Sequence, residues 1–192
     1  MSLSTSFTGE DSLDLVIETG NATSTSATIL NMNGMDDKMN LDGITYTFPL
    51  GESTTIMVGD STDVSALYST ACTYSAFTDL LSNCGSGNAA GLGGGSDFTA
   101  SPNSASSATV AAAYDFGNGF TMAGGLSGTG GSDSGLFTKE SLDVYGLQAA
   151  YNTDSYGVSL SYALTETSTT ADTTFFGVNA YYALEDLSLI HI

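Results

Sequence analysis

The clearest pattern in the chain is SLDVYGLQAAYNTDSYGVSLSYAL, residues 141–164, where apolar and small polar residues alternate through two arms joined by a turn. A period of two residues is that of a β-strand, so the stretch predicts a β-hairpin with one apolar and one polar face. The apolar positions of the second arm are Tyr156, Val158, Leu160, Tyr162 and Leu164. The polar positions between them are Ser155, Gly157, Ser159 and Ser161.

Tyrosines stand near both ends of the apolar face, Tyr145 and Tyr151 in the first arm and Tyr156 and Tyr162 in the second. Aromatic residues at both borders of an apolar band are typical of outer-membrane barrel strands. The interval between Tyr156 and Tyr162 covers roughly 20 Å along a strand, or about 14 Å vertically at a tilt of about 45°, against an apolar band of about 25 Å. A sandwich strand would instead bury the apolar face in a core, so the hairpin alone leaves both folds open.

The charge of the chain is strongly one-sided. Asp and Glu number 21 whereas Lys and Arg number 2, namely Lys38 and Lys139, which gives a net charge of −19. Nucleic acid and anionic membrane surfaces are therefore poor partners. No apolar run reaches the roughly 18 residues of a transmembrane helix. The opening residues lack the basic start and apolar core of a signal peptide, so we expect any export signal to lie upstream.

The same alternation recurs along the chain. Pro49 ends one of the predicted strands because proline cannot donate to a ladder, and Asn118-Gly119 is a strong signal for a hairpin turn. Short turns alternate with longer loops, which is typical of an all-β, antiparallel, up-and-down barrel in an outer membrane. Including the hairpin, we predict about nine or ten strands. The further strands are expected over residues 2–8, 13–18, 39–48, 54–60, 108–116, 120–126 and 173–184, with a short one around 27–30.

Residues 61–104 break this rhythm and end rich in Gly, Ser and Asn. A loop of this length counts against a compact soluble domain and is usual on the outer side of a porin. We expect it to narrow the channel mouth or fold inward, with a short helix over 74–81. Its two cysteines, Cys72 and Cys84, predict a disulfide in an oxidising compartment, the alternative being two unpaired thiols.

Three stretches carry a resemblance to a known family: LSTSFTGED at residues 3–11, LDGITYTFPLG at 41–51 and YGLQAAY at 145–151. They resemble the OprB-like carbohydrate porins of cyanobacterial outer membranes, also described as iron-uptake porins. The resemblance covers most of the predicted strands but not the loops. It implies a barrel of about sixteen strands that follows a signal peptide and a cell-wall-binding domain.

The resemblance implies that residues 1–186 are a fragment of about nine or ten strands from a larger transmembrane barrel. Residues 187–192, LSLIHI, resemble translated adapter read-through, so we expect this tail to be non-native. The implied location is the bacterial outer membrane. The implied partners are a lipid bilayer, small hydrophilic solutes or cations, and further copies of the chain in a homo-oligomer such as a trimer.

The alternation also assigns side chains to the two faces of the wall. The second strand of the family usually carries basic residues that point into the lumen, whereas the matching positions here are Asp14, Val16 and Glu18, and an acidic wall favours cations. The predicted pore-lining residues are Asp14, Glu18, Thr45, Thr47, Gln148, Ser159, Ser161 and Asn179. The predicted lipid-interface aromatics are Tyr46, Phe48, Tyr114, Phe116, Tyr145, Tyr151, Tyr156, Tyr162 and Tyr182.

The sequence offers little for catalysis. The single histidine, His191, lies in the tail, so neither a Ser/His/Asp triad nor a multi-histidine metal site can be assembled. Asp14 and Glu18 are about 13 Å apart along a strand, too far for an acid/base couple. We therefore predict a passive channel without catalytic residues, metal or cofactor. The alternative is a secreted or surface-attached β-sandwich that acts as an adhesin or binding module.

Overall fold

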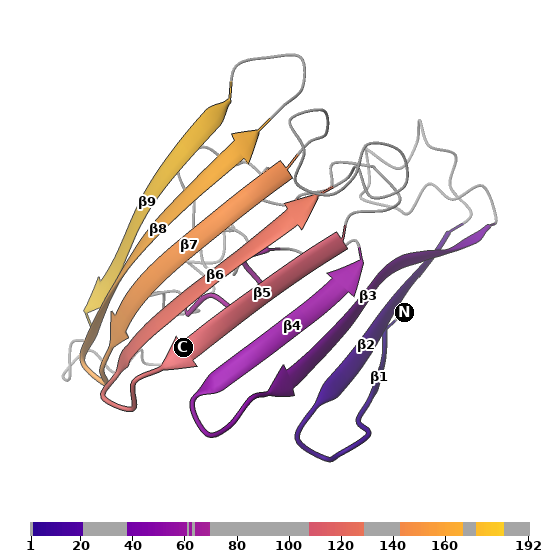
Figure 1. Ribbon diagram of the computed structural model, residues 1–192, viewed down its shortest axis with the longest axis horizontal. Helices are drawn as coiled ribbons and strands as arrows, with labels where there is room; N and C mark the ends of the chain where they lie inside the picture. Colours follow the sequence, from indigo (N-terminus) through magenta and orange to yellow (C-terminus); the bar gives the residue numbers. More distant parts are fainter. Residues whose placement is uncertain are drawn as a thin grey trace, which may run out of the picture.

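The protein is described here by a computed structural model that covers residues 2–20, 38–60, 62, 64–69, 108–128, 143–166 and 172–182. Nine strands form one antiparallel sheet in which the order across the sheet equals the order along the chain (Figure 1). This confirms the predicted all-β, up-and-down topology, and the described residues contain no helix. Strands β1 and β9 are the two edges, so the sheet they bound is open.

The strands follow the predicted ranges closely, and β4 coincides with the range predicted from alternation. Pro49 is the last residue of β3, as expected. The short strand expected around 27–30 and the helix expected over 74–81 lie outside the described residues. The strands are β1 Ser2–Thr5, β2 Ser12–Thr19, β3 Met39–Pro49, β4 Thr54–Asp60, β5 Ala108–Asp115, β6 Phe120–Gly128, β7 Asp143–Asn152, β8 Tyr156–Glu166 and β9 Thr173–Tyr182.

The first strand ends earlier than the alternation predicts, at Thr5 instead of Thr8. The reason is the carboxylate of Asp11, whose Oδ1 accepts hydrogen bonds from the backbone N–H groups of Phe7 at 3.0 Å and Thr8 at 2.7 Å. These donors are therefore held in the turn. A ladder needs the same donors, so β1 stops where the carboxylate captures them.

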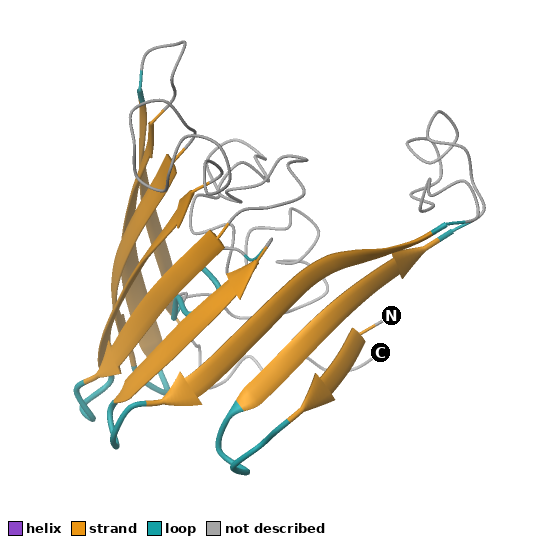
Figure 2. Ribbon diagram, turned by 45° about the vertical axis from the view of Figure 1, so that its right-hand side comes forward, coloured by secondary structure: helices purple, strands orange, loops and turns teal. Residues whose placement is uncertain are grey.

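Short turns join β1 to β2, β3 to β4, β5 to β6 and β7 to β8, all at one end of the sheet (Figure 2). The turn after β5 shows why glycine is needed there. Gly119 has a φ of 85°, and a Cβ on it would collide with the carbonyl oxygen of Asn152. The Asn152 N–H donates to the Gly119 carbonyl at 2.9 Å, so this turn is packed against the end of β7.

The register between β2 and β3 shifts by one residue in mid-strand. Val16 pairs with Gly43, whereas Ile17 pairs with Leu41, which leaves one extra residue in β3 as a β-bulge. A one-residue shift exchanges the two faces of a strand. Leu41 therefore shares the face of Ile44, and the apolar side of β3 continues past the bulge.

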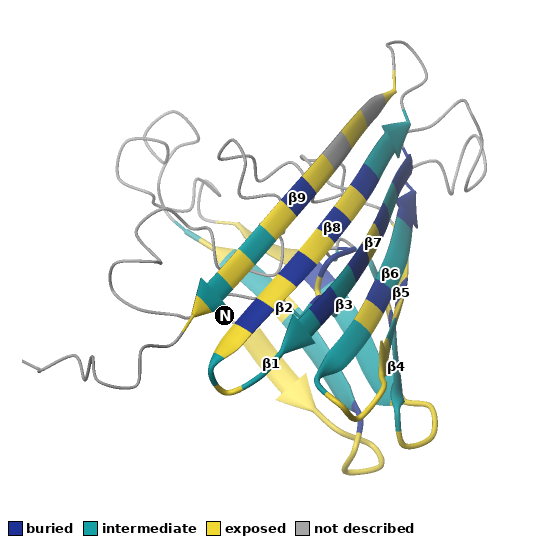
Figure 3. Ribbon diagram, turned by 90° about the vertical axis from the view of Figure 1, so that its left-hand side faces the viewer, coloured by how far each residue is buried: buried dark blue, intermediate teal, exposed yellow. Residues whose placement is uncertain are grey.

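The sheet is curved into a trough. In the view toward its β9 edge, β1, β2 and β3 lie across from β7, β8 and β9 (Figure 3). The short magenta segment that follows β4 lies behind β5 and β6 in Figure 1, within the trough. The two faces of the sheet thus have different surroundings.

Candidate functional site

The candidate site is the pair of faces of this sheet, which the ladder pairing defines across the strands. Paired residues point to the same side, and alternate residues of a strand point to opposite sides. We use the term inner face for the side of the sheet that carries one line of paired residues, namely Thr47, Met57, Ala111, Gly125, Gly146 and Ala163. We call outer face the side of the rung Tyr46, Val58, Val110, Leu126, Tyr145 and Leu164.

Burial on the two faces is the reverse of that in a water-soluble sheet. In β8 the outer-face side chain Leu160 is 46% exposed, whereas its neighbour Ser161 on the inner face is 2% exposed. Figure 3 shows this alternation as stripes along β8. A one-sided sheet in water buries its apolar side chains and exposes its polar ones. Here the apolar face is outside.

Exposed apolar side chains extend over the outer face from one edge strand to the other. Such a surface is much larger than the scattered apolar residues of an ordinary soluble domain, and it indicates an interaction with something apolar. The exposed members within the strands are Leu3, Met39, Leu41, Val58, Val110, Tyr114, Met122, Leu147, Tyr156, Val158, Leu160, Tyr162, Phe176, Val178 and Tyr182.

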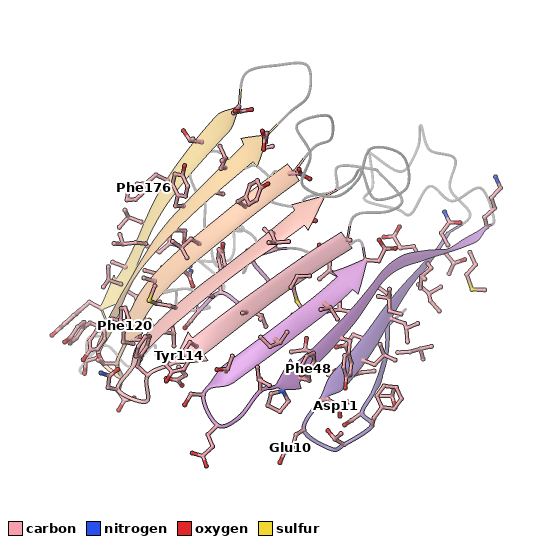
Figure 4. The ribbon with its side chains drawn as sticks, in the orientation of Figure 1. Glu10, Asp11, Phe48, Tyr114, Phe120 and Phe176 are labelled. Carbon is pink, nitrogen blue, oxygen red and sulfur yellow. The ribbon has the colours of Figure 1, made fainter. Side chains whose placement is uncertain are left out.

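An aromatic row crosses the outer face at the end with the short turns. Figure 4 shows Phe48, Tyr114 and Phe120 near this end, on β3, β5 and β6, and Phe176 farther along β9. Around the β5–β6 turn the rings are in contact, with centroids 4.7 Å apart for Tyr114 and Phe116 and 5.1 Å apart for Phe116 and Phe120. The row consists of Phe7, Tyr46, Phe48, Tyr114, Phe116, Phe120, Tyr151, Tyr156 and Tyr182.

The nine predicted lipid-interface aromatics all belong to the outer face by register and alternation. Seven lie in the aromatic row, while Tyr145 and Tyr162 lie toward the other end of β7 and β8. The sequence prediction omitted Phe7, Phe120 and Phe176. The alternation places all three on the outer face, because Phe7 continues the parity of Leu3, Phe120 opens the parity of Met122, and Phe176 shares the parity of Tyr182.

The turn between β1 and β2 is organised by Asp11, which the sequence prediction missed. Asp11 is only 7% exposed, and its carboxylate accepts hydrogen bonds from the hydroxyls of Ser6 at 2.6 Å and Thr8 at 2.7 Å. The Tyr46 hydroxyl donates to Oδ2 at 2.8 Å, which ties the turn to the aromatic row. These hydrogen bonds, chiefly those of Ser6 and Thr8, hold the pKa of Asp11 well below its usual range.

The eight predicted pore-lining residues all belong to the inner face, but they occupy two different settings. On β2 and β3, Asp14, Glu18, Thr45 and Thr47 are half-buried. On β7 and β8, by contrast, three residues are buried. These three are Gln148, Ser159 and Ser161, while Asn179 on β9 is half-buried.

Part of the inner face is covered by Thr62 and residues 64–69, which we call the inner segment. The Thr109 hydroxyl on β5 donates to the Thr62 carbonyl at 2.8 Å. The amide of Asn152 on β7 donates to the Ser69 hydroxyl at 2.9 Å. Between these two anchors, Val64 is fully buried against the sheet. This portion of the loop predicted over 61–104 therefore lies on the inner face.

Several predictions fall on residues that the structure does not describe. They are the Cys72–Cys84 disulfide, the remainder of the loop, and the tail at 187–192. Within the described ranges, no cluster of three or more His, Cys, Asp or Glu side chains is arranged to hold a metal ion. The same ranges hold no helix long and apolar enough to cross a membrane.

No protein-family profile matches the chain, and no curated protein matches it at a significant level.

Proposed function

We propose that this sheet is part of the wall of an up-and-down transmembrane β-barrel in an outer membrane, with its outer face toward lipid and its inner face toward a water-filled passage. The observation that carries the proposal is the reversed burial of the two faces. An exposed Leu160 beside a buried Ser161 is unfavourable in water and favourable in a bilayer. A β-sandwich adhesin would bury the opposite face.

The aromatic row supports the same proposal. Transmembrane barrel strands carry a girdle of aromatic residues at each membrane interface, because these side chains have an apolar body and a polar tip. Here aromatic rings at the short-turn end are in contact in the β5–β6 turn region and again between Tyr151 and Tyr156 of β7 and β8. The second girdle would begin at Tyr145, Tyr162 and Phe176, on the opposite half of the outer face.

The edges of the sheet must be paired in such a setting, because unsatisfied backbone groups do not occur in the hydrocarbon region. Strands alternate in direction, so β1 and β9 run the same way. An all-antiparallel closure therefore requires an odd number of further strands between β9 and β1. Sixteen strands, as in the OprB-like porins that residues 3–11, 41–51 and 145–151 resemble, would leave about seven, which is odd.

The channel would pass small hydrophilic solutes and prefer cations. The charged inner-face residues on β2, Asp14 and Glu18, are both acidic, and rings or patches of carboxylates select for cations in pores. Asp14 accepts a hydrogen bond from the Ser12 hydroxyl at 2.7 Å, which orients it on the wall. The passage needs no catalytic residue or cofactor. Further copies would assemble laterally through lipid-facing strands, as in a trimer.

Reconstitution tests the proposal. The complete protein, with the strands that close the barrel, purified in detergent and added to planar bilayers, should give discrete conductance steps, with a reversal potential in a salt gradient that indicates cation preference. Protein that stays monodisperse without detergent and gives no conductance would instead support the sandwich. Anion preference would contradict the role given to Asp14 and Glu18.

A further inference from the structure

The inner segment is seated in a socket of small residues on β5, β6 and β7. The residues under it are Ala111, Ala113, Ala123, Gly125 and Gly146, all on the inner face. Val64 packs with Val144, and Tyr68 packs with Ala123 and Ala113. Larger side chains at these positions would hold the segment away from the sheet.

Two glycines show how closely the segment approaches. A Cβ on Gly125 would lie 2.7 Å from Val64 Cγ2 and 2.9 Å from the Val64 carbonyl oxygen. The second contact is with backbone, which cannot be relieved by rotating a side chain. A Cβ on Gly146 would meet the Tyr68 hydroxyl. Both glycines have ordinary φ values, so space, not backbone conformation, explains them.

The covered and open parts of the inner face differ sharply. On one rung of the ladder, Ala111 of β5 is 3% exposed, whereas Thr47 of β3 is half-buried. Ser4 and Asn40, on the inner face of β1 and β3, are exposed. Thr62 also reaches β3, where its hydroxyl is hydrogen-bonded to the Thr45 hydroxyl and donates to the Ile44 carbonyl at 3.3 Å. The segment thus covers the inner face from this part of β3 to β7, and it leaves β1 and β2 uncovered.

We infer that the inner segment is a fixed obstruction, seated in the socket at Gly125 and Gly146, that confines permeation to the passage along β1, β2 and the part of β3 that the segment leaves uncovered. This inference rests on the proposed channel function. It makes the two glycines positioning residues for the pore and places Asp14 and Glu18 on the part of the described inner face that the segment leaves uncovered. Selectivity is then set by one side of the wall.

The test uses cysteine accessibility and conductance in a background with Cys72→Ser and Cys84→Ser. A water-soluble methanethiosulfonate reagent should modify Thr47→Cys at least about tenfold faster than Ala111→Cys, because thiol reactivity follows exposure. Adding Gly125→Val should displace the segment, so that the rate at Ala111→Cys approaches that at Thr47→Cys. Conductance of the reconstituted channel should rise by about twofold as the bore widens.

Gly124 provides the matched control, since it neighbours Gly125 but belongs to the outer face. A Cβ there would have its nearest contact at 3.3 Å, so Gly124→Ala should leave both rates unchanged. Tyr68→Ala removes the other half of the contact without altering the sheet, and it should expose Ala111→Cys even where Gly125→Val impairs folding.

Two outcomes would overturn the inference. They are equal rates at Thr47→Cys and Ala111→Cys in the parent, or an unchanged rate at Ala111→Cys after both releasing substitutions. If no variant conducts while the rates of thiol modification differ as expected, the channel proposal fails. The seating of the inner segment at Gly125 and Gly146 would still be supported.

Discussion

The two faces of the sheet use apolar side chains in opposite ways. On the outer face they form a broad exposed surface that includes Met122, whereas on the inner face they form small buried contacts that include Met57. The inner contacts are ordinary protein packing, between the sheet and the chain that folds onto it. The outer surface has no such cover in the described residues. Burial of apolar side chains, which is the rule for proteins in water, is therefore a property of the inner face and not of the outer face.

The largest effect is expected from removing Met57, which is 1% exposed. Met57→Ala should lower the free energy of unfolding by roughly 2–5 kcal/mol, because it leaves a cavity in close packing. The matched change Met122→Ala, on the outer face where the side chain is 39% exposed, should cost less than about 1 kcal/mol. Urea unfolding in detergent measures both. Equal losses in the free energy of unfolding would show that the two faces do not differ in how tightly their side chains are packed.

The second-largest effect is expected from introducing a charge on the outer face. Leu160→Arg should destabilise the bilayer-inserted protein by about 2–4 kcal/mol, the cost of a cation near the membrane midplane. The same substitution at a water-exposed position would change stability by less than about 0.5 kcal/mol. Thr47→Arg, on the open inner face, is the control and should insert normally. Unfolding and insertion into vesicles measure the difference, and a harmless Leu160→Arg would argue for water on the outer face.

The third effect is a change in ion selectivity when acidic residues of the inner face are replaced. Asp14→Asn combined with Glu18→Gln removes two carboxylates and should lower the cation-to-anion permeability ratio by about twofold or more, without a loss of conductance steps. The control is Glu10→Gln in the β1–β2 turn, which removes an exposed charge away from the inner wall. An unchanged ratio in the double variant would mean that the passage does not follow β2.

The smallest effect concerns pH and the Asp11 turn. The folded state lowers the pKa of Asp11 below its ordinary value of 3.8, so the turn stabilises the fold above about pH 4 and loses this contribution as the pH falls further. Asp11→Asn cannot accept the same set of hydrogen bonds. The stability difference between wild type and Asp11→Asn should therefore be larger at pH 7 than at pH 2.5. A difference independent of pH would show that the carboxylate charge is not involved.

The strands and their faces could be predicted because alternation is a local property of the sequence. The pattern around Leu160 and Ser161 identified both faces of β8, and Pro49 marked the end of β3. Sequence could not reveal the bulge opposite Ile17, since a register shift depends on which residues of the partner strand pair. The capture of backbone donors by Asp11 is equally a matter of three-dimensional geometry.

The inner segment lay beyond sequence reasoning for a related reason. Glycine is unfavourable inside a strand, so the sequence gives no reason for Gly125 and Gly146. The close approach of Val64 and Tyr68 explains them. An inward fold of the loop was expected, but its seat on β5 to β7 depends on contacts between residues far apart in the chain. The eight predicted pore-lining residues consequently share a face without sharing the same access to solvent.

The most direct test of whether the outer face lies against lipid is to measure the surroundings of residue 160. A nitroxide spin label on Leu160→Cys, in the background lacking Cys72 and Cys84, can be probed in vesicles by collision with apolar oxygen and with a water-soluble nickel chelate. We predict strong relaxation by oxygen and little by nickel at this position, with the reverse for a label on Thr47→Cys. Stronger relaxation by nickel than by oxygen at position 160 would place the outer face in water and contradict a membrane wall.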